Sequence, residues 1–239
     1  MRLLVWIVTA LSLLAQTPAF EVASIKPNQS GSRESTLPGV RNGRLFAENV
    51  TLKWILMAAY GMSASRVIGP EWLDADRYDL SGKSPEGVPD TEAKPMLQAL
   101  LRDRFKLEAH SEQREMPVYE LLVAKGGVKM PIYPAKDPPE VAHAPGAQMI
   151  MWTGAKMDGL ASSLANVAGG PVIDKTGLTT RYNVNLVYAP LMPRPDGMQV
   201  DAPDLFTAMH DQLGLRLQSA RAKVEVIVVD RMERKPTEN

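Results

Sequence analysis

The chain has 239 residues, contains no cysteine, and carries 27 basic and 27 acidic side chains. The absence of cysteine excludes a disulfide-stapled scaffold and a thiol nucleophile. A balanced charge gives no bulk attraction to nucleic acid or to an anionic membrane surface, so no nucleic-acid partner is expected.

Residues 1–19 have the pattern of an export signal. A positive start at Met1-Arg2 precedes an apolar run from Leu3 to Ala15, which is too short to span a bilayer comfortably. Small residues follow at Thr17 and Ala19, so we expect cleavage and a periplasmic or extracellular protein without an integral membrane segment. An uncleaved N-terminal anchor is the alternative.

The remainder of the chain contains an internal repeat. The segment Arg77-Tyr78-Asp79-Leu80 returns as Arg181-Tyr182-Asn183-Val184, and further matches keep their order. The offset drifts only from 104 residues at the Arg-Tyr pair to 108 residues between Leu97 and Leu205. A repeat of this length predicts two copies of one folding unit.

In the first half the pattern predicts strands and helices in a definite order. These are a strand over 20–27 with Phe20, Val22 and Ile25 buried, a loop over 28–42, a strand over 43–49, a helix over 52–60, a strand over 77–83, a helix over 90–105, and two paired strands over 105–114 and 118–124. The first helix is the best defined. Thr51 is its expected N-cap, Gly61 its expected stop, and its buried face is Leu52, Ile55, Leu56 and Ala59.

The second half repeats this order after a Pro-rich linker over 125–148. We expect a strand over 148–153, a helix capped by Asp158 and stopped by Gly169-Gly170, strands over 171–173 and 181–188, a helix over 204–213, and a strand pair over 215–220 and 224–230. The polar tail over 235–239 is expected to fray.

This organisation predicts an α+β fold with two tandem pseudo-equivalent halves, each of mostly antiparallel strands with two helices packed on one face. The expected boundaries are 1–19 for the signal, 20–124 for the N-terminal half, 125–148 for the linker and 149–239 for the C-terminal half. The repeat leaves two accounts open: a duplication used for folding alone, or a pseudo-symmetric pair with a binding groove between the halves.

The search for histidine and nucleophile chemistry assigns no catalytic, cofactor-binding or metal-binding residue, and no cofactor is expected. His110 and Glu112 alternate on a predicted strand, but two ligands without a third make a weak metal site. His143 falls in the linker, and His210 is expected to be a partly buried helix residue. No Gly-x-Ser-x-Gly elbow and no Ser-x-x-Lys motif occurs.

Three further motifs are better explained by turns and strands. Asp174-Lys175-Thr176-Gly177 resembles the phosphorylated loop of ion pumps but is expected to be a turn in which Asp174 accepts backbone hydrogen bonds. Asp74-x-Asp76-x-x-Asp79 lacks the glycine and glutamate of a calcium loop. The segment 81–84 ends like a P-loop but lacks its first glycine.

The aromatic residues leave a choice between a groove and a core. They could line a glycan or peptide groove, although the equivalence of Tyr78 and Tyr182 favours packing on each half's own core. The residues concerned are Trp54, Trp72, Trp152, Tyr60, Tyr78 and Tyr182.

Several segments together resemble a bacterial exported family named domain of unknown function 3738. They are 20–27 directly after the signal, 58–61, 69–73, 77–79, 101–107, 117–119, 172–178, 213–215 and the tail 235–239. The resemblance implies export but no activity. Some relatives resemble this domain fused to a membrane-bound sensor, which suggests sensing. Relatives usually show Gly-Tyr-Asp where this chain has Arg181-Tyr182-Asn183.

The leading hypothesis is therefore a non-catalytic binding, sensing or interaction module for an unidentified protein, peptide or glycan ligand. One alternative is a hydrolase of unfamiliar type that uses carboxylates such as Asp79, Asp174 or Glu112. Another is a structural envelope protein whose sheet edges pair with partners.

We predict that the mature protein lacks the first 15 to 20 residues, because the signal ends in small residues that suit a signal peptidase. Intact-mass spectrometry of protein recovered from the producing cells will check this. A soluble cytosolic protein that still begins with Met1-Arg2 would contradict it.

Overall fold

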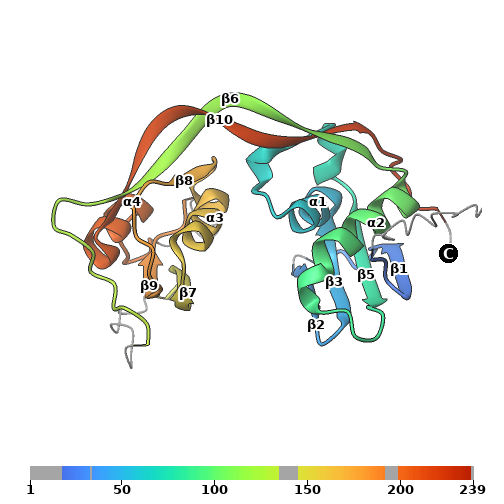
Figure 1. Cartoon of the computed structure of the whole chain (residues 1–239), viewed down its shortest axis with the longest axis horizontal. Helices are drawn as coiled ribbons and strands as arrows, with labels where there is room; N and C mark the ends of the chain where they lie inside the picture. Colours follow the sequence, from blue (N-terminus) through green and yellow to red (C-terminus); the bar gives the residue numbers. More distant parts are fainter. Residues whose placement is uncertain (1–17, 33, 135–144, 192–198, 238–239) are drawn as a thin grey trace, which may run out of the picture.

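Two lobes are joined by one long two-stranded ribbon, which arches over the space between them (Figure 1). The computed structural model describes residues 18–32, 34–134, 145–191 and 199–237. Most of the predicted signal, His143 and the middle of the Pro-rich segment lie outside these residues. The mixture of helices with mainly antiparallel sheets confirms the predicted α+β class.

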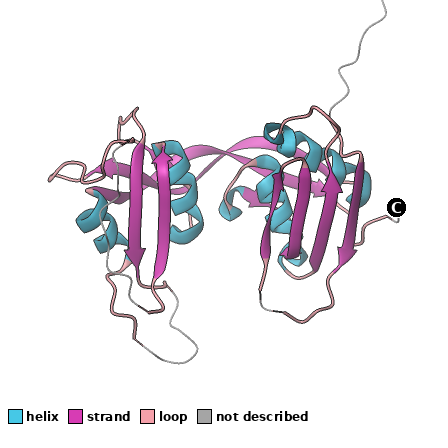
Figure 2. Cartoon of the chain, turned by 90° about the horizontal axis from the view of Figure 1, so that it is seen from below, coloured by secondary structure: helices cyan, strands magenta, loops and turns pink. Residues whose placement is uncertain are grey.

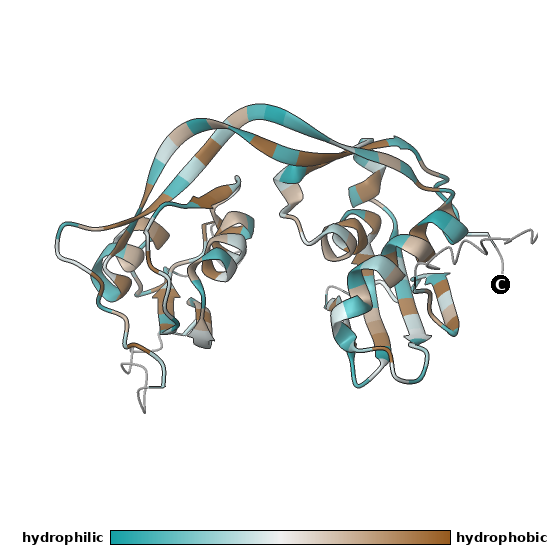
Figure 3. Cartoon of the chain, viewed as in Figure 1, coloured by the Kyte–Doolittle hydropathy of each residue, from teal (hydrophilic) through white to brown (hydrophobic). Residues whose placement is uncertain are grey.

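The ribbon consists of β6 (Glu108–Val123) and β10 (Leu215–Arg231), which pair antiparallel along their whole length. The prediction of two short strands at the end of each half is therefore wrong, because each half ends in one continuous strand that pairs with the other half. In the middle of the ribbon no core covers either face, and hydrophilic residues interrupt the hydrophobic ones (Figure 3). A polar stretch between two hydrophobic stretches is the sequence pattern of a turn, and for this reason it predicts two short strands in place of one long strand.

Pro117 lies inside β6 without breaking the ribbon. The backbone N–H of Tyr119, two residues later, points away from β10 and donates to the carbonyl of Pro171 at 2.8 Å. The nitrogen of Pro117 faces the same outer edge of β6, where the described residues place no pairing strand. A missing N–H there removes no ladder hydrogen bond.

The N-terminal lobe packs two helices against a four-stranded antiparallel sheet with the strand order β1-β5-β3-β2. Its elements are β1 (Val22–Pro27), β2 (Thr36–Arg41), β3 (Arg44–Thr51), α1 (Leu52–Tyr60), the short β4 (Val67–Ile68), β5 (Arg77–Lys83) and α2 (Ala93–Phe105). The predicted buried face of α1 is fully buried, and both predicted end signals are confirmed: Thr51 caps the helix and Gly61 ends it in the left-handed region.

Two expectations for the start of this lobe are wrong. Residues 36–41 form strand β2, not loop, and join β3 through Asn42-Gly43, which both have positive φ as a tight two-residue hairpin requires. Val22 is 65% exposed, because it points to the face of β1 opposite Ala23 and Ile25. Ile25 is buried in the core, and Phe20 and Ala23 pack against it partly buried.

From β3 onward, the elements of the N-terminal lobe have counterparts in the same order in the C-terminal lobe, where β1 and β2 have none. The counterparts are β7 (Gln148–Ala155), α3 (Met157–Ala168), β8 (Val172–Asp174), β9 (Tyr182–Tyr188), α4 (Leu205–Ala208) and a π-helical turn, η4 (Met209–Leu213). The predicted cap Asp158 lies inside α3, whose N-cap position is Lys156. The described start of the Pro-rich segment pairs with β9: Tyr133 N donates to Arg181 O, and Asn183 N to Pro131 O. Figure 2 shows the two lobes from below.

Each lobe contributes strands to the other. β4 of the first lobe pairs parallel with β10, and β8 of the second lobe pairs parallel with β6. Val229 of β10 packs in the N-terminal core, whereas Leu121 of β6 packs in the C-terminal core. Neither half can therefore complete its core with its own residues.

The repeated Arg-Tyr-Asp/Asn segment holds a bulge that precedes the first helix of each lobe. Asn49 and Gly154 interrupt the register of β3 and β7, and both have positive φ. Asp79 Oδ1 accepts from Asn49 N at 2.9 Å, and Asn183 Oδ1 accepts from Gly154 N at 3.1 Å.

The arginines complete the same arrangement. Arg77 donates to the carbonyl of Asn49 at 2.7 Å, and Arg181 donates to that of Gly154 at 3.2 Å. The tyrosines of the motif, Tyr78 and Tyr182, are buried in their own cores as expected. The amide oxygen of Asn183 thus accepts the hydrogen bond that a carboxylate oxygen of Asp79 accepts in the first lobe.

The chain ends on the N-terminal lobe, and the expected fraying of the tail is wrong for its described part. Glu233 N donates to Phe105 O and Thr237 N donates to Arg104 O, each at 2.7 Å. These bonds satisfy carbonyls that α2 leaves free at its C-terminus. Tyr78 Oη also donates to Arg234 O at 2.6 Å. Within the described residues, no helix is long and apolar enough to cross a bilayer.

We predict that Asp79→Ala lowers the free energy of unfolding by about 1–3 kcal/mol, because it leaves the buried N–H of Asn49 without an acceptor. Asp79→Asn should cost clearly less, since Asn183 plays the same part with an amide oxygen. Urea denaturation of both variants measures the difference. Equal destabilisation by alanine and asparagine would show that the acceptor is not what position 79 supplies.

Candidate functional site

A cleft of about 430 Å³ lies between the lobes, beneath the ribbon. The N-terminal lobe lines it with the turn after α1 and with Arg66, the C-terminal lobe with α3, and the ribbon with Val224 and Glu225. Its volume is in the usual range for small-ligand sites, which commonly occur where two domains meet.

The wall formed by the C-terminal lobe is small and polar. Gly159, Ser162, Ser163 and Asn166 are spaced by three and four residues, so they share the face of α3 opposite its buried face. Among the described residues, no protein group hydrogen-bonds the side chain of Ser163 or Asn166, and both are open to a ligand.

Trp152 extends this wall from β7 onto α3. Its side chain remains 41% exposed. A Cβ added at Gly159 would lie 2.7 Å from a ring carbon of Trp152, so only glycine permits this close packing of ring on helix. The missing side chain of Gly159 therefore leaves the room in which the indole lies against α3 at the cleft.

The N-terminal lobe has an apolar surface next to the cleft. A second hollow, of about 200 Å³, is lined by Trp54, Met57 and Ala58 of α1 together with Leu37 and Pro38 of β2. Met62 and Asn166 line both hollows, so the two adjoin each other. Trp54 is also 41% exposed, and with Trp152 it is one of the aromatic residues whose groove role the sequence left open.

The two walls come from corresponding helices. At an offset of 105 residues, the buried residues of α1 fall on the buried residues Met157, Leu160, Ala161 and Leu164 of α3. At the same offset Trp54, Met57 and Ala58 correspond to Gly159, Ser162 and Ser163. The faces of α1 and α3 that point into the cores are thus apolar in both helices. The opposite faces differ, because that of α1 is apolar and that of α3 is small and polar.

Arg66 and Glu225 are the charged residues that line the cleft, and they contact each other. Arg66 Nε donates to the backbone carbonyl of Glu225 at 2.7 Å, and its guanidinium lies 4.0 Å from the Glu225 carboxylate. Ser111 Oγ donates to the same carboxylate at 2.8 Å. The pair therefore contributes no net charge to the cleft, and the ribbon edge at this carbonyl is already occupied.

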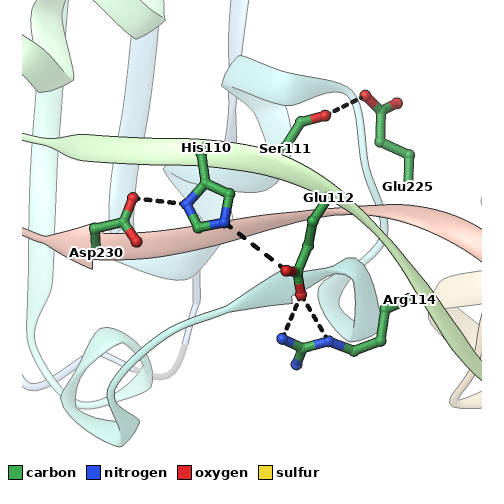
Figure 4. Close-up of polar contacts among 6 residues, drawn as sticks. All are labelled: His110, Ser111, Glu112, Arg114, Glu225 and Asp230. Carbon is green, nitrogen blue, oxygen red and sulfur yellow. Dashed lines mark hydrogen bonds and ion pairs between the residues drawn. The ribbon is translucent and has the colours of Figure 1, made fainter.

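A second polar group lies on the ribbon near the N-terminal lobe, as Figure 4 shows. His110 Nδ1 lies 2.8 Å from Asp230, and His110 Nε2 lies 3.9 Å from Glu112, which Arg114 also binds at 2.9 and 2.5 Å. His110 and Glu112 share one face of the strand, as predicted. The side chains are exposed and each carboxylate has a basic partner, so the group is an ion-pair network on a solvated strand face.

The carboxylates suggested for hydrolysis lie apart. Asp79 holds the bulge of β3, Glu112 belongs to the ribbon network, and Asp174 accepts from Thr176 N at 2.9 Å and from its hydroxyl at 2.7 Å. The turn role predicted for Asp174 is thereby confirmed. The structure brings no two of these three together.

The other sequence motifs are also dispersed. Asp74 pairs with Lys53 at 2.9 Å, and Asp76 pairs with Arg234, which lowers the pKa of Asp76 through its hydrogen bonds. Residues 81–83 continue strand β5, so they form no phosphate loop. His210 is exposed, contrary to expectation, because it follows the buried Met209 and points away from the core. Within the described ranges, no group of three metal-ligating side chains occurs.

Sequence reasoning missed most of the cleft. It singled out Trp54 and Trp152 but not Arg66, Glu225 or the polar face of α3. The available signal was the run Gly159, Ser162, Ser163, Asn166 on the solvent face of a predicted helix, where long charged side chains are more usual.

We predict that the pKa of His110 lies above its ordinary value near 6.5, because the hydrogen bond and charge of Asp230, with Glu112, favour the imidazolium. A raised folded-state pKa means that the contribution to stability is complete below the unfolded pKa and is lost as the pH rises through the folded pKa. NMR titration of the imidazole measures this. Asp230→Asn should lower the pKa, and an unchanged value would contradict the assignment.

Comparison with known proteins matches one family model, described as a protein of unknown function (DUF3738), over residues 53–232. No curated protein and no solved structure matches the chain. The matched stretch extends from α1 to the residue after β10, so it includes α3 and the whole ribbon but not Leu37 and Pro38 of β2. Because the model covers most of the sequence, the chain belongs to the DUF3738 family.

Proposed function

We propose that this protein is an exported, non-catalytic binding module whose ligand lies in the cleft between the lobes. The observation that carries the proposal is the contrast between the corresponding helices α1 and α3, which line two adjoining hollows, the first apolar and the second polar. The core faces stay alike because both lobes must fold, whereas the exposed faces are free of that constraint. We propose that the exposed faces differ because each contacts a different part of one ligand.

The state of the cleft side chains supports a binding role. Trp54 and Trp152 are large apolar groups that remain 41% exposed, although a folded protein gains free energy by burying them. The side chains of Ser163 and Asn166 have no partner among the described residues. Exposed aromatics beside free hydrogen-bonding groups are typical of a ligand site.

The non-catalytic part of the proposal rests on the charges. Among the described residues, Glu225 is the single carboxylate that lines the cleft, and it is paired with Arg66. Hydrolysis of a glycosidic bond by carboxylates needs two of them on either side of the bond. Export follows from the sequence pattern of residues 1–19 and is tested by the mass of the mature chain.

We predict that filling the cleft abolishes ligand binding without unfolding the protein. A library of neutral oligosaccharides, amphipathic peptides and phosphorylated metabolites should contain compounds that raise the melting temperature of the wild-type protein. Ser162→Trp should remove that shift, because the indole occupies the space beside α3. Thermal-shift assays measure both effects.

Thr180→Trp is the matched control, since it adds the same side chain at an exposed position outside the cleft. It should bind as the wild type does. Failure of every compound, or binding that survives Ser162→Trp unchanged, would contradict a ligand site in the cleft.

A further inference from the structure

We infer that the ligand of the cleft is a neutral oligosaccharide, with one sugar ring stacked on Trp152. The inference deepens the proposed function and rests on it. It depends on three properties of the cleft: its charge, the state of its backbone, and the contrast between its walls.

The charge excludes strongly ionic ligands. Arg66 and Glu225 are the only charged residues among those lining the two hollows, and they lie against each other. A phosphate or a polyanion needs unpaired basic groups, which bind it through charge-assisted hydrogen bonds. The cleft offers hydroxyl and amide groups instead, and these suit an uncharged polar ligand.

The backbone disfavours an extended peptide. A peptide that adds to a sheet needs free backbone groups along an exposed edge. In the cleft the carbonyl of Glu225 already accepts from Arg66, and the carbonyl of Pro171 accepts from Tyr119 N. Proline at position 171 also has no N–H to donate. Neither position can pair with an added strand.

The walls match the two kinds of surface on a sugar. A pyranose ring has an apolar C–H face and a rim of hydroxyl groups. The face can stack on an indole ring, whose π-face is electron-rich. The rim can bond to Ser163 and Asn166, which lie one and two turns along α3 from the residue that supports Trp152. The adjoining apolar hollow, which Trp54 lines, offers a surface for a second sugar ring.

Gly159 is a positioning residue for this site. It does not need to touch the sugar, because its role is to let the indole of Trp152 lie flat against α3. Gly159→Ala would push the far edge of a side chain and not the backbone, so the protein should fold while the ring is displaced. Gly159→Ala therefore distinguishes a site that needs the indole in one fixed orientation from a site that needs only an apolar surface.

The test is isothermal titration calorimetry with chitotetraose, cellotetraose and maltotetraose, and with an amphipathic leucine–serine peptide as the competing class. We expect at least one tetrasaccharide to bind and to change the tryptophan fluorescence. Trp152→Ala should weaken that binding about tenfold, as loss of one stacked ring predicts. Trp152→Phe should retain most of it, and Gly159→Ala should weaken it while leaving the melting temperature nearly unchanged.

Phe206→Ala is the matched control, because Phe206 is an aromatic residue of similar exposure, 44%, that does not line the cleft. It should bind the sugar as tightly as the wild type. Binding of the peptide but of none of the sugars would overturn the saccharide assignment and leave the cleft as a binding site. Sugar binding that survives both Trp152→Ala and Ser162→Trp would place the sugar elsewhere and overturn the proposed function as well.

Discussion

The pairing of β6 with β10 is the interaction on which the rest of the structure depends. A two-stranded ribbon of 16 and 17 residues is much longer than an ordinary strand pair, and an isolated hairpin of this kind is only marginally stable in water. Here each end is anchored, because Val229 enters one core and Leu121 enters the other. The ribbon is therefore stabilised by the two lobes that it holds together, and it sets the space that becomes the cleft.

The exposed middle of the ribbon carries features that keep other strands from pairing with it. Pro117 removes a donor from the outer edge of β6, and Arg66 occupies a carbonyl of β10. The exposed pair of Arg221 with Glu115, 3.2 Å apart, adds charge near the centre. Charged side chains and proline on an edge are known means of preventing aggregation. A ribbon so protected can stay open to water between two lobes.

A comparison of the two halves distinguishes the residues that both lobes need for folding from the residues that differ between the lobes. The bulge residues Asn49 and Gly154 donate their backbone N–H groups to corresponding side chains, and the core faces of α1 and α3 coincide. The halves differ on the helix faces that neither core requires, where Trp54 corresponds to Gly159 and Met57 to Ser162. The ligand is placed there because these faces line two adjoining hollows and because Trp54 and Trp152 remain exposed beside them.

The sequence by itself determined the local elements, the α+β class and the presence of a repeat. The buried face of α1 could be predicted because amphipathic spacing, the cap Thr51 and the stop Gly61 all act within one helix. Strand β2 could have been predicted from Asn42-Gly43, but the polar composition around that hairpin concealed it. Only the tertiary structure decided which strands pair across the halves, since the partners in the ribbon lie about a hundred residues apart and have no core to pattern their middle. It also decided the site: Ser163 and Asn166 look like ordinary surface residues until the ribbon brings α3 opposite α1, because a cleft is a relation between two surfaces that neither segment encodes alone.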